Sequence, residues 1–253
     1  MTKKHTLLTT FVGIIFLTAC STSTPAPTQV APPSAITAPP TQPEPATATR
    51  FATFTPAPTF TSTPLPLFFT EEFNADISSW VSFQTGGETI PAVKIENDTL
   101  RLDISSPNTW YYAIYTPHDY QNVSISAKVS GTPSGSVGLI CRYTESGWYE
   151  FNVSSDGTYS VLLAQRLSEG IAHYTPISTD EGQYLQAGNL NYEITLTCQE
   201  NTLLLFIDGN LFRKLDVSHY GLTTGKVGIN ASSFTETPMC ATFDWVKVSE
   251  PSQ

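Results

Sequence analysis

A run of short strands and tight turns over residues 136–164 constrains the fold more than any other stretch of the chain. Its strands and turns are, in order, 136–144, 145–147, 148–154, 155–157 and 158–164. Each turn ends in glycine, which readily adopts the positive φ of a tight reversal. Asp156-Gly157 between two alternating strands is a strong indicator of a hairpin. The centre of the chain therefore predicts antiparallel β structure.

The rest of residues 67–253 repeats this pattern, with Gly, Asn and Asp between short strands. Further strands are predicted at 67–73, 92–95, 99–104, 110–116, 122–129, 172–177, 191–198, 202–207, 211–217, 225–230 and 240–248. A short capped turn at 76–80 is expected to place Trp80 in the core. Many short strands at regular spacing predict an all-β domain, a two-sheet antiparallel β-sandwich.

The first 19 residues have the pattern of an export signal. Lys3 and Lys4 form a basic region, and an apolar run over 7–17 follows that is too short to span a bilayer stably. The run ends in Leu-Thr-Ala-Cys at residue 20, which resembles the lipobox of bacterial lipoproteins. The resemblance implies a signal peptide at 1–19 and a lipidated Cys20. The expected location is extracytoplasmic, anchored to a membrane at the cell surface or outer membrane.

Residues 20–66 differ from the rest of the chain because Thr, Pro, Ala and Ser make up nearly all of them. Such a segment has too few apolar side chains to offset the entropy of ordering a backbone. We therefore expect a disordered Pro/Thr-rich linker with polyproline II character, which acts as a stalk.

The predicted domain at 67–253 is acidic. It holds 21 Asp and Glu residues against 9 Lys and Arg residues, a net charge of −12. Nucleic acid and anionic lipid both need a basic face on the protein that binds them. The composition therefore argues against both as partners of this domain.

Several motifs of the domain occur in a familiar order. They are Glu71-Glu72-Phe73, 138–143, 148–151, 156–159, 201–210, 225–229 and 243–248. This order is similar to the concanavalin A-like lectin/glucanase superfamily, in the laminin-G-like branch found on bacterial surface lipoproteins. The resemblance covers nearly all of the domain and implies a jelly roll. It is weak for function, because the superfamily includes lectins, glycosidases and adhesion modules.

Three cysteines are left once Cys20 is assigned to lipid, and an odd number allows at most one internal bridge. Alternation with apolar neighbours lets both Cys141 and Cys198 point inward. The resembled family often carries cysteine at both positions, which implies a Cys141–Cys198 disulfide and a buried, free Cys240. No histidine lies near these cysteines at the spacing of a zinc site.

The sequence carries no recognisable catalytic motif. Laminarinase-type members of the superfamily use a Glu-x-Asp-x-x-Glu strand, which is absent here. The serine nucleophile elbow, the His-Glu-x-x-His zinc motif and the phosphate loop are also absent. No catalytic residue is therefore assigned. A glycoside hydrolase with unrecognised carboxylates stays an alternative, and it requires two carboxylates about 5–10 Å apart.

Two groups of aromatic and polar residues are candidate ligand-binding residues. The first group is Arg142, Tyr143, Trp148, Tyr149 and Glu150, and the second is Trp110 and Tyr112. Aromatic rings stack on the C–H faces of sugars, and planar polar side chains bond sugar hydroxyls. The alternative is structural, because the same residue types fill sandwich cores and an Arg–Glu pair often joins neighbouring strands.

The sequence thus predicts a surface-anchored lipoprotein whose sandwich binds an extracellular ligand, with carbohydrate favoured, without turnover. The alternatives are an extracellular glycoside hydrolase and a structural envelope or adhesion protein. The expected partners are an extracellular glycan or surface polymer and, through Cys20, a lipid bilayer. No cofactor or metal site is assigned. Asp208-Gly209-Asn210 offers oxygen ligands for Ca²⁺, but this sequence is first of all a turn.

Overall fold

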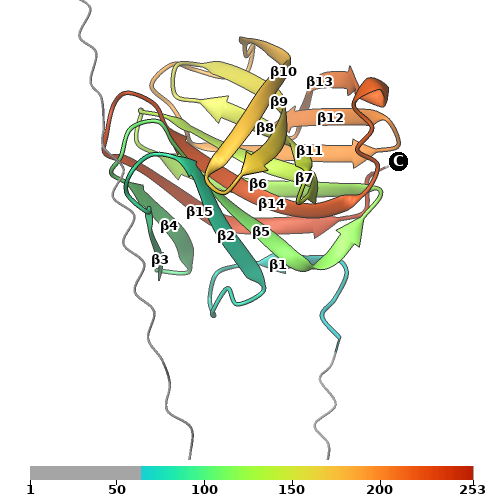
Figure 1. Cartoon of the computed structure of the whole chain (residues 1–253), viewed down its shortest axis with the longest axis horizontal. Coiled ribbons are helices and arrows are strands. Elements are labelled where there is room, and N and C mark those ends of the chain that lie inside the picture. Colours follow the sequence, from blue (N-terminus) through green and yellow to red (C-terminus); the bar gives the residue numbers. More distant parts are fainter. Residues whose placement is uncertain (1–63, 253) are drawn as a thin grey trace, which may run out of the picture. The chain divides into compact units, whose positions relative to one another are not determined.

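The structure, a computed structural model, describes residues 64–252 as a two-sheet antiparallel β-sandwich (Figure 1). This confirms the predicted fold class. The signal peptide, Cys20 and the linker up to residue 63 lie outside the described residues, so their assignments stay predictions. Sheet A contains β1 (Phe69–Glu71), β3 (Ala92–Glu96), β4 (Thr99–Ile104), β6 (Val123–Gly131), β11 (Tyr192–Gln199), β12 (Thr202–Ile207), β13 (Asn210–Asp216) and β15 (Met239–Ser249). Sheet B contains β2 (Trp80–Gly86), β5 (Thr109–Tyr120), β7 (Ser136–Thr144), β8 (Gly147–Ser154), β9 (Thr158–Ser168), β10 (Ile171–Glu181) and β14 (Gly225–Ser233).

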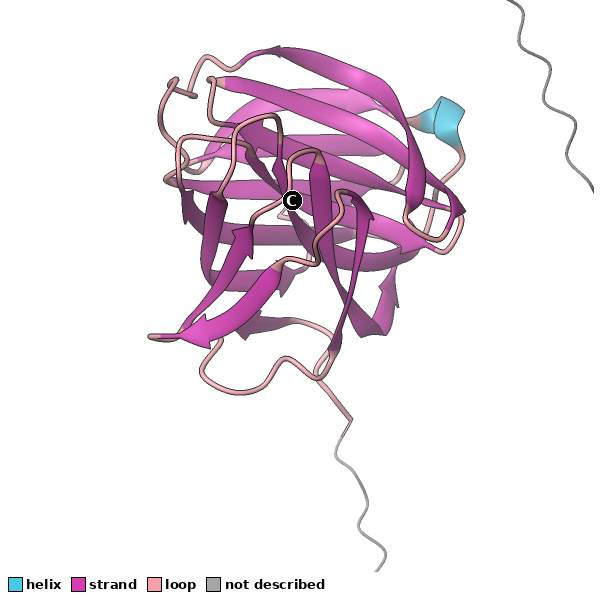
Figure 2. Cartoon of the chain, turned by 60° about the vertical axis from the view of Figure 1, so that its left-hand side comes forward, coloured by secondary structure: helices cyan, strands magenta, loops and turns pink. Residues whose placement is uncertain are grey.

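The order of strands mixes near and distant parts of the chain. Sheet A runs β13-β12-β11-β6-β15-β4-β3, with β1 paired to β15, and sheet B runs β10-β9-β8-β7-β14-β5-β2. Between residues 64 and 252 the only helical element is a 3₁₀ turn at Ser218–Tyr220 (Figure 2). That part of the chain therefore contains no helix long and apolar enough to cross a membrane.

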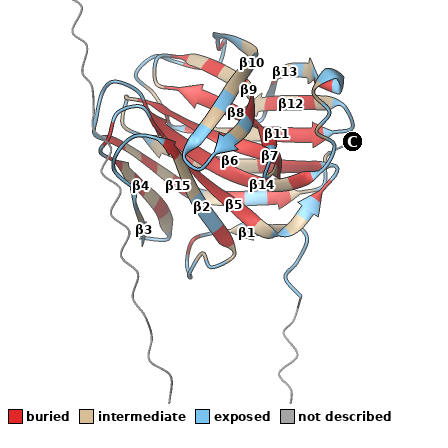
Figure 3. Cartoon of the chain, in the orientation of Figure 1, coloured by how far each residue is buried: buried red, intermediate tan, exposed pale blue. Residues whose placement is uncertain are grey.

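The main core lies between the two sheets, where alternate side chains of each strand meet. Figure 3 shows buried residues along the central strands of both sheets. Leu139, Phe151 and Val161 enter it from sheet B, and Ile125 and Leu196 enter it from sheet A. All five side chains are fully buried. The two-residue period of a strand explains why every second position is apolar in these segments.

The central run of strands forms as its turns predict. Strand β8 pairs with β7 on one side and β9 on the other. In the second turn the Asp156 carboxylate accepts the backbone N–H of Thr158 at 2.9 Å, and Gly157 has a φ of 86°. A side chain that bonds its own turn and a glycine with positive φ together fix the reversal.

The sequence analysis does not predict strand β2. It does predict the burial of Trp80, the first residue of this strand, and Trp80 is buried. Its side chains do not alternate between buried and exposed, because β2 is an edge strand. Strand β10 was predicted over 172–177 and extends further, to Ile171–Glu181.

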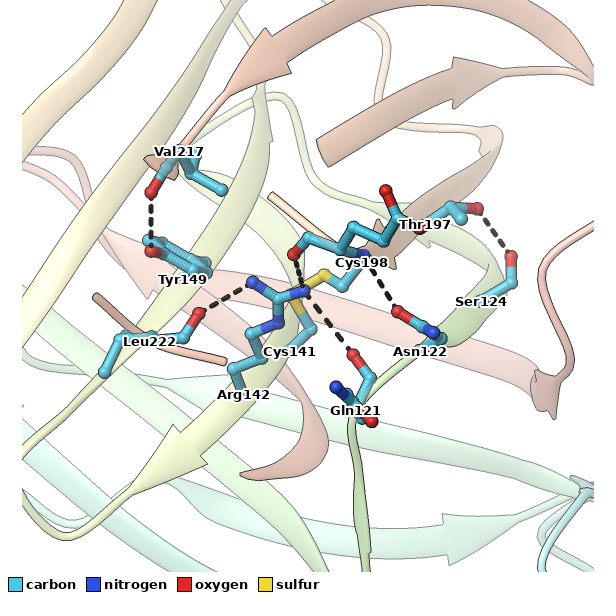
Figure 4. The surroundings of a disulfide bond; sticks show 11 residues. Gln121, Asn122, Ser124, Cys141, Arg142, Tyr149, Thr197, Cys198, Val217 and Leu222 are labelled. Atoms are coloured by element: carbon cyan, nitrogen blue, oxygen red, sulfur yellow. Dashed lines mark hydrogen bonds between the residues drawn. A yellow bond between two sulfur atoms is a disulfide. The ribbon is translucent and has the colours of Figure 1, made fainter. Parts of the chain in front are cut away.

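The predicted Cys141–Cys198 disulfide is confirmed, and it joins β7 of sheet B to β11 of sheet A with a Cα–Cα distance of 6.6 Å (Figure 4). Cys240 is free as expected, but it is partly exposed rather than buried. The reason is that Cys240 alternates with Met239 and Ala241, which occupy the core-facing positions of β15.

Candidate functional site

Most of the predicted ligand-binding residues gather on the face of sheet B that points away from the main core. We call this group of side chains the aromatic cluster; it consists of Phe83, Trp110, Tyr112, Tyr143, Trp148 and Tyr174, with the polar Glu150 beside it. Its rings pack closely, since Trp148 lies edge-on to Tyr112 with centroids 5.3 Å apart and Phe83 stacks on Tyr112 at 4.7 Å. Trp148, Tyr112 and Glu150 are fully buried.

The cluster is buried because sheet B curls until its two edges meet. Figure 1 shows the hairpin of β9 and β10 reaching over toward β2. The Tyr174 hydroxyl of β10 bonds the Tyr112 hydroxyl and the Thr85 hydroxyl, both at 2.7 Å. At the hairpin tip the Gly86 N–H of β2 donates to the Gly170 carbonyl at 3.2 Å. A ligand reaches the three buried rings, Tyr112, Tyr143 and Trp148, only if the hairpin moves, whereas the other three rings are partly exposed. The ligand-binding role of these residues stays a prediction.

Glu150 is a buried carboxyl without an ion pair among the described residues. Its Oε2 accepts the indole N–H of Trp148 at 3.0 Å, and its Oε1 accepts the Asn152 amide at 3.1 Å. The side-chain oxygen of Asn152 in turn accepts a hydrogen bond from the side-chain amide of Asn230 at 2.7 Å. Both side chains lie against Gly138, where the Cβ of any other residue would collide with the side-chain oxygens of both asparagines. Burial raises the pKa of Glu150, and these hydrogen bonds only partly oppose the shift.

The raised pKa of Glu150 predicts a stability change with pH that a glutamine would remove. Between the ordinary glutamate pKa and the raised one, the folded state holds a proton that the unfolded state has lost. The free energy of unfolding should therefore fall as pH rises through this window. Urea unfolding at a series of pH values should show Glu150→Gln gaining stability relative to the natural protein as pH rises. Parallel pH profiles for the two proteins would contradict the burial argument.

Two of the predicted residues, Arg142 and Tyr149, lie apart from the aromatic cluster. Tyr149 points into the main core, where its hydroxyl donates to the Val217 carbonyl at 3.5 Å. Arg142 has a φ of 53° at a bulge in β7, which turns its side chain toward the loops beside the disulfide (Figure 4). No hydrogen bond or ion pair joins Arg142 to Glu150 in residues 64–252. The structure therefore does not form the Arg142–Glu150 group that the sequence suggested.

Arg142 holds three loops together by binding their backbone carbonyls. Its guanidinium donates to the carbonyl of Leu222 at 2.6 Å, of Gln121 at 3.4 Å, and of Glu200. Burial lowers the pKa of Arg142, since these partners are neutral. The side chain is fully buried and joins loops of both sheets. This arrangement gives Arg142 a structural role at one end of the sandwich.

The Asp208-Gly209-Asn210 segment forms the turn between β12 and β13. Asp208 and Gly209 have positive φ values, and the Asp208 carboxylate accepts the Glu193 N–H at 2.8 Å. Residues 64–252 contain no group of three or more His, Cys, Asp and Glu side chains placed to hold a metal ion.

An open groove of about 580 Å³ lies on the outer face of sheet A. Its floor includes short hydroxyl side chains on β6 and β11, larger side chains stand on the flanking strands β12 and β15, and the lining continues past β15 to Thr70 of β1. We call it the sheet A groove; it is lined by Thr70, Glu72, Ser124, Ser126, Glu193, Thr195, Thr197, Leu204, Phe206, Gly209, Trp245, Lys247, Ser249 and Ser252. Trp245 and Phe206 are partly exposed, so their rings are available to a ligand.

The hollow arises from the size of the side chains in neighbouring strands. In one row across the sheet, Phe206 of β12 lies opposite Thr195 of β11, which lies opposite Ser126 of β6, followed by Lys247 of β15. The two long side chains at the ends of this row stand above the two short ones in the middle. The next row also has short hydroxyl side chains on its two floor strands; it consists of Leu204, Thr197, Ser124 and Ser249.

The sequence analysis did not select the sheet A groove. The signal existed, because Ser124 and Ser126 alternate with buried apolar residues in β6, as Thr195 and Thr197 do in β11. Alternation indicates that these hydroxyls face away from the core, but it does not indicate which strands are neighbours.

No known protein-family model matches the sequence, and no curated protein matches it. Solved structures with the same fold do exist. A protein of unknown function with a galectin-like fold from Bacillus subtilis has 11% identity and a TM-score of 0.55, and the match covers 72% of this chain and 94% of that one. A β-glucanase from Bacillus licheniformis has 15% identity, a TM-score of 0.50, and coverage of 73% and 98%. A family 16 glycoside hydrolase endo-glucanase from Bacteroides ovatus has 13% identity, a TM-score of 0.51, and coverage of 72% and 99%.

These similarities define the class of fold. The described residues share their fold with these glucanases and with the galectin-like protein, which confirms the jelly-roll fold that the resemblance implied. At such low identities the similarity establishes the fold alone, and function has to be argued from the site.

Proposed function

We propose that this protein is a membrane-anchored lipoprotein whose β-sandwich binds carbohydrate in the sheet A groove without turnover. The observation that carries the proposal is a floor of four hydroxyl side chains on β6 and β11, two of them partly exposed, beside the rings of Phe206 and Trp245. Ring faces can stack on sugar C–H groups while hydroxyls exchange hydrogen bonds with sugar hydroxyls. Two of the similar structures are glucanases, and this supports a glycan as the ligand.

The carboxylates of the domain support binding rather than hydrolysis. Glycoside hydrolysis needs a pair of carboxyl groups about 5–10 Å apart, one of which acts as an acid. The carboxyl with a raised pKa is Glu150, which is fully buried among aromatic rings and accepts hydrogen bonds from the Trp148 indole and the Asn152 amide. In the sheet A groove, Glu72 directly follows β1 and Glu193 lies on β11, and strands β15 and β6 lie between β1 and β11.

The test is binding of the purified full-length protein to a polysaccharide panel, with chromatography of any soluble products. We expect retention of at least one glycan and no released oligosaccharide. Trp245→Ala should weaken that binding at least about tenfold, since large aromatic side chains dominate binding sites. Phe234→Ala, which removes an exposed ring outside the groove, serves as the matched control and should bind normally. Released oligosaccharides would establish the hydrolase alternative instead.

The same panel distinguishes the sheet A groove from the aromatic cluster. Trp110 is the partly exposed member of the second predicted group and stacks on Tyr174 with centroids 5.8 Å apart. If Trp110→Ala abolishes binding and Trp245→Ala does not, the ligand lies under the β9–β10 hairpin and the sheet A groove is not the site. We expect the opposite result.

Membrane anchoring through Cys20 is the second part of the proposal, and its support is the lipobox resemblance of the sequence. In a bacterial host, the natural protein should be found in the membrane fraction and should incorporate labelled fatty acid. Cys20→Ala should move the protein out of that fraction, because a covalent lipid supplies most of the membrane affinity. Retention of Cys20→Ala in the membrane, without label, would show that another segment anchors the chain.

A further inference from the structure

We propose that the sheet A groove accepts an internal stretch of a neutral, linear polysaccharide that lies along strands β6 and β11. This inference rests on the proposed function and adds the chemical class and the direction of the ligand. It draws on the register of the strands, the hydrogen bonding of the floor, the charges of the lining and the size of the residues at the two ends.

The direction of the ligand follows from the position of the walls. The floor is two strands wide, so the wall strands β12 and β15 are three strand spacings apart, or about 14 Å between backbones. Successive floor rows along each strand are about 6.7 Å apart, because alternate residues share a face. Phe206 and Trp245 stand on opposite walls and in neighbouring rows. A chain running between the walls therefore meets the two rings one after the other.

The floor is built to bind hydroxyl groups. The Thr195 hydroxyl donates to the Ser126 hydroxyl at 2.7 Å, and the Ser124 and Thr197 hydroxyls are paired at 2.8 Å. A hydroxyl has one donor and two acceptor positions, so each pair keeps one donor and several acceptor positions unused. Sugar hydroxyls can both donate and accept, which matches this mixture. A ligand with only acceptors would leave most of these positions unused.

The charge of the lining excludes a polyanion. The charged residues in the groove are Glu72, Glu193 and Lys247, a net charge of −1. The predicted domain as a whole has a net charge of −12. Uronic acid or phosphate polymers would be repelled by both charges. The acidic surface attracts polycations in a non-specific, salt-dependent way, but in the groove Lys247 stands on the strand between the two carboxylates, so a polycation finds no matched site there. A neutral glycan is the class that fits.

The ends of the groove are low, which favours an internal stretch over a chain end. Gly209 lies at one end, at the turn after β12, and Ser249 and Ser252 lie at the other. These residues are too small to close the groove. A polysaccharide can therefore enter at one end and leave at the other, and recognition does not need a reducing or non-reducing terminus.

The experiment measures dissociation constants of the full-length protein for three soluble polymers: mixed-linkage β-glucan or mannan as neutral chains, alginate as a polyanion and chitosan as a polycation. A neutral polymer should bind at least about tenfold more tightly than either charged polymer, with little dependence on salt concentration. Binding should also be tighter for the polymer than for a disaccharide of the same sugar, because one disaccharide cannot contact both rings.

Variants test the geometry separately. Phe206→Ala and Thr195→Val should each weaken binding of the neutral polymer several-fold, and Tyr184→Ala, an exposed ring elsewhere, should not. Preference for alginate or chitosan, or equal affinity for the disaccharide, would overturn this inference while leaving carbohydrate binding intact. Absence of binding to every glycan would overturn both the inference and the proposed function. Groove variants that bind like the natural protein would place the ligand elsewhere.

Discussion

Trp148→Ala is expected to lower the free energy of unfolding by about 3–5 kcal/mol, the range for a buried tryptophan replaced by alanine. The indole is fully buried against Tyr112, Phe83 and Tyr143. Its removal leaves a large cavity under the β9–β10 hairpin. It also removes one of the hydrogen-bond donors of the buried Glu150 carboxyl and leaves the Asn152 amide, which adds a cost for an under-satisfied polar group.

Urea unfolding followed by fluorescence or circular dichroism measures this effect. Trp148→Phe is the matched control: it keeps most of the ring volume and loses only the N–H that Glu150 accepts. We expect it to destabilise the protein by clearly less than Trp148→Ala. Leu211→Ala, at an exposed position of β13, should change stability little. If Trp148→Ala keeps normal stability but loses glycan binding, the ring contacts a ligand instead of packing the cluster.

Removal of the Cys141–Cys198 disulfide is expected to cost about 4 kcal/mol. The bridge closes a loop with a sequence separation of 57 residues, and the loss of chain entropy in the unfolded state grows with the logarithm of that length. It also joins the two sheets beside Arg142, whose guanidinium holds loops from both (Figure 4). Both effects stabilise the same end of the sandwich.

The double variant Cys141→Ala/Cys198→Ala should show a lower urea midpoint than the natural protein. Cys240→Ser should unfold near the natural midpoint, because Cys240 is a free, partly exposed cysteine. A reducing agent should lower the midpoint of the natural protein and of Cys240→Ser, and leave the double variant unchanged. Equal midpoints for the oxidised natural protein and the double variant would show that the bridge does not stabilise the fold.

Local chemistry was sufficient to predict most strands and the class of the fold. Asp156-Gly157 determines a reversal by its own hydrogen bond and its positive φ, whatever the rest of the chain does. Two-residue alternation determines which side chains face inward, as Leu139 and Cys141 do. Strand β2 was missed because its pattern is irregular at the edge of sheet B. The disulfide came from the family resemblance.

The candidate sites depended on contacts between distant segments. Arg142 and Glu150 are close in sequence, yet a bulge turns Arg142 toward the loops at residues 121, 200 and 222, and Glu150 faces the aromatic cluster. A bulge in the backbone changes the facing of every residue it contains, and the alternation of side chains does not reveal it.

The sequence by itself determined where the chain turns, which residues face the core, and the sandwich that follows from them. Only the tertiary structure decided that β10 reaches β2 and encloses the aromatic cluster, and that β12, β11, β6 and β15 lie side by side. The physical reason is that turns and side-chain alternation are local, whereas the neighbour of each strand is chosen by packing and hydrogen bonding between segments far apart in the chain. The sheet A groove is made from four such strands, so it forms only when these strands pair with one another in the folded protein.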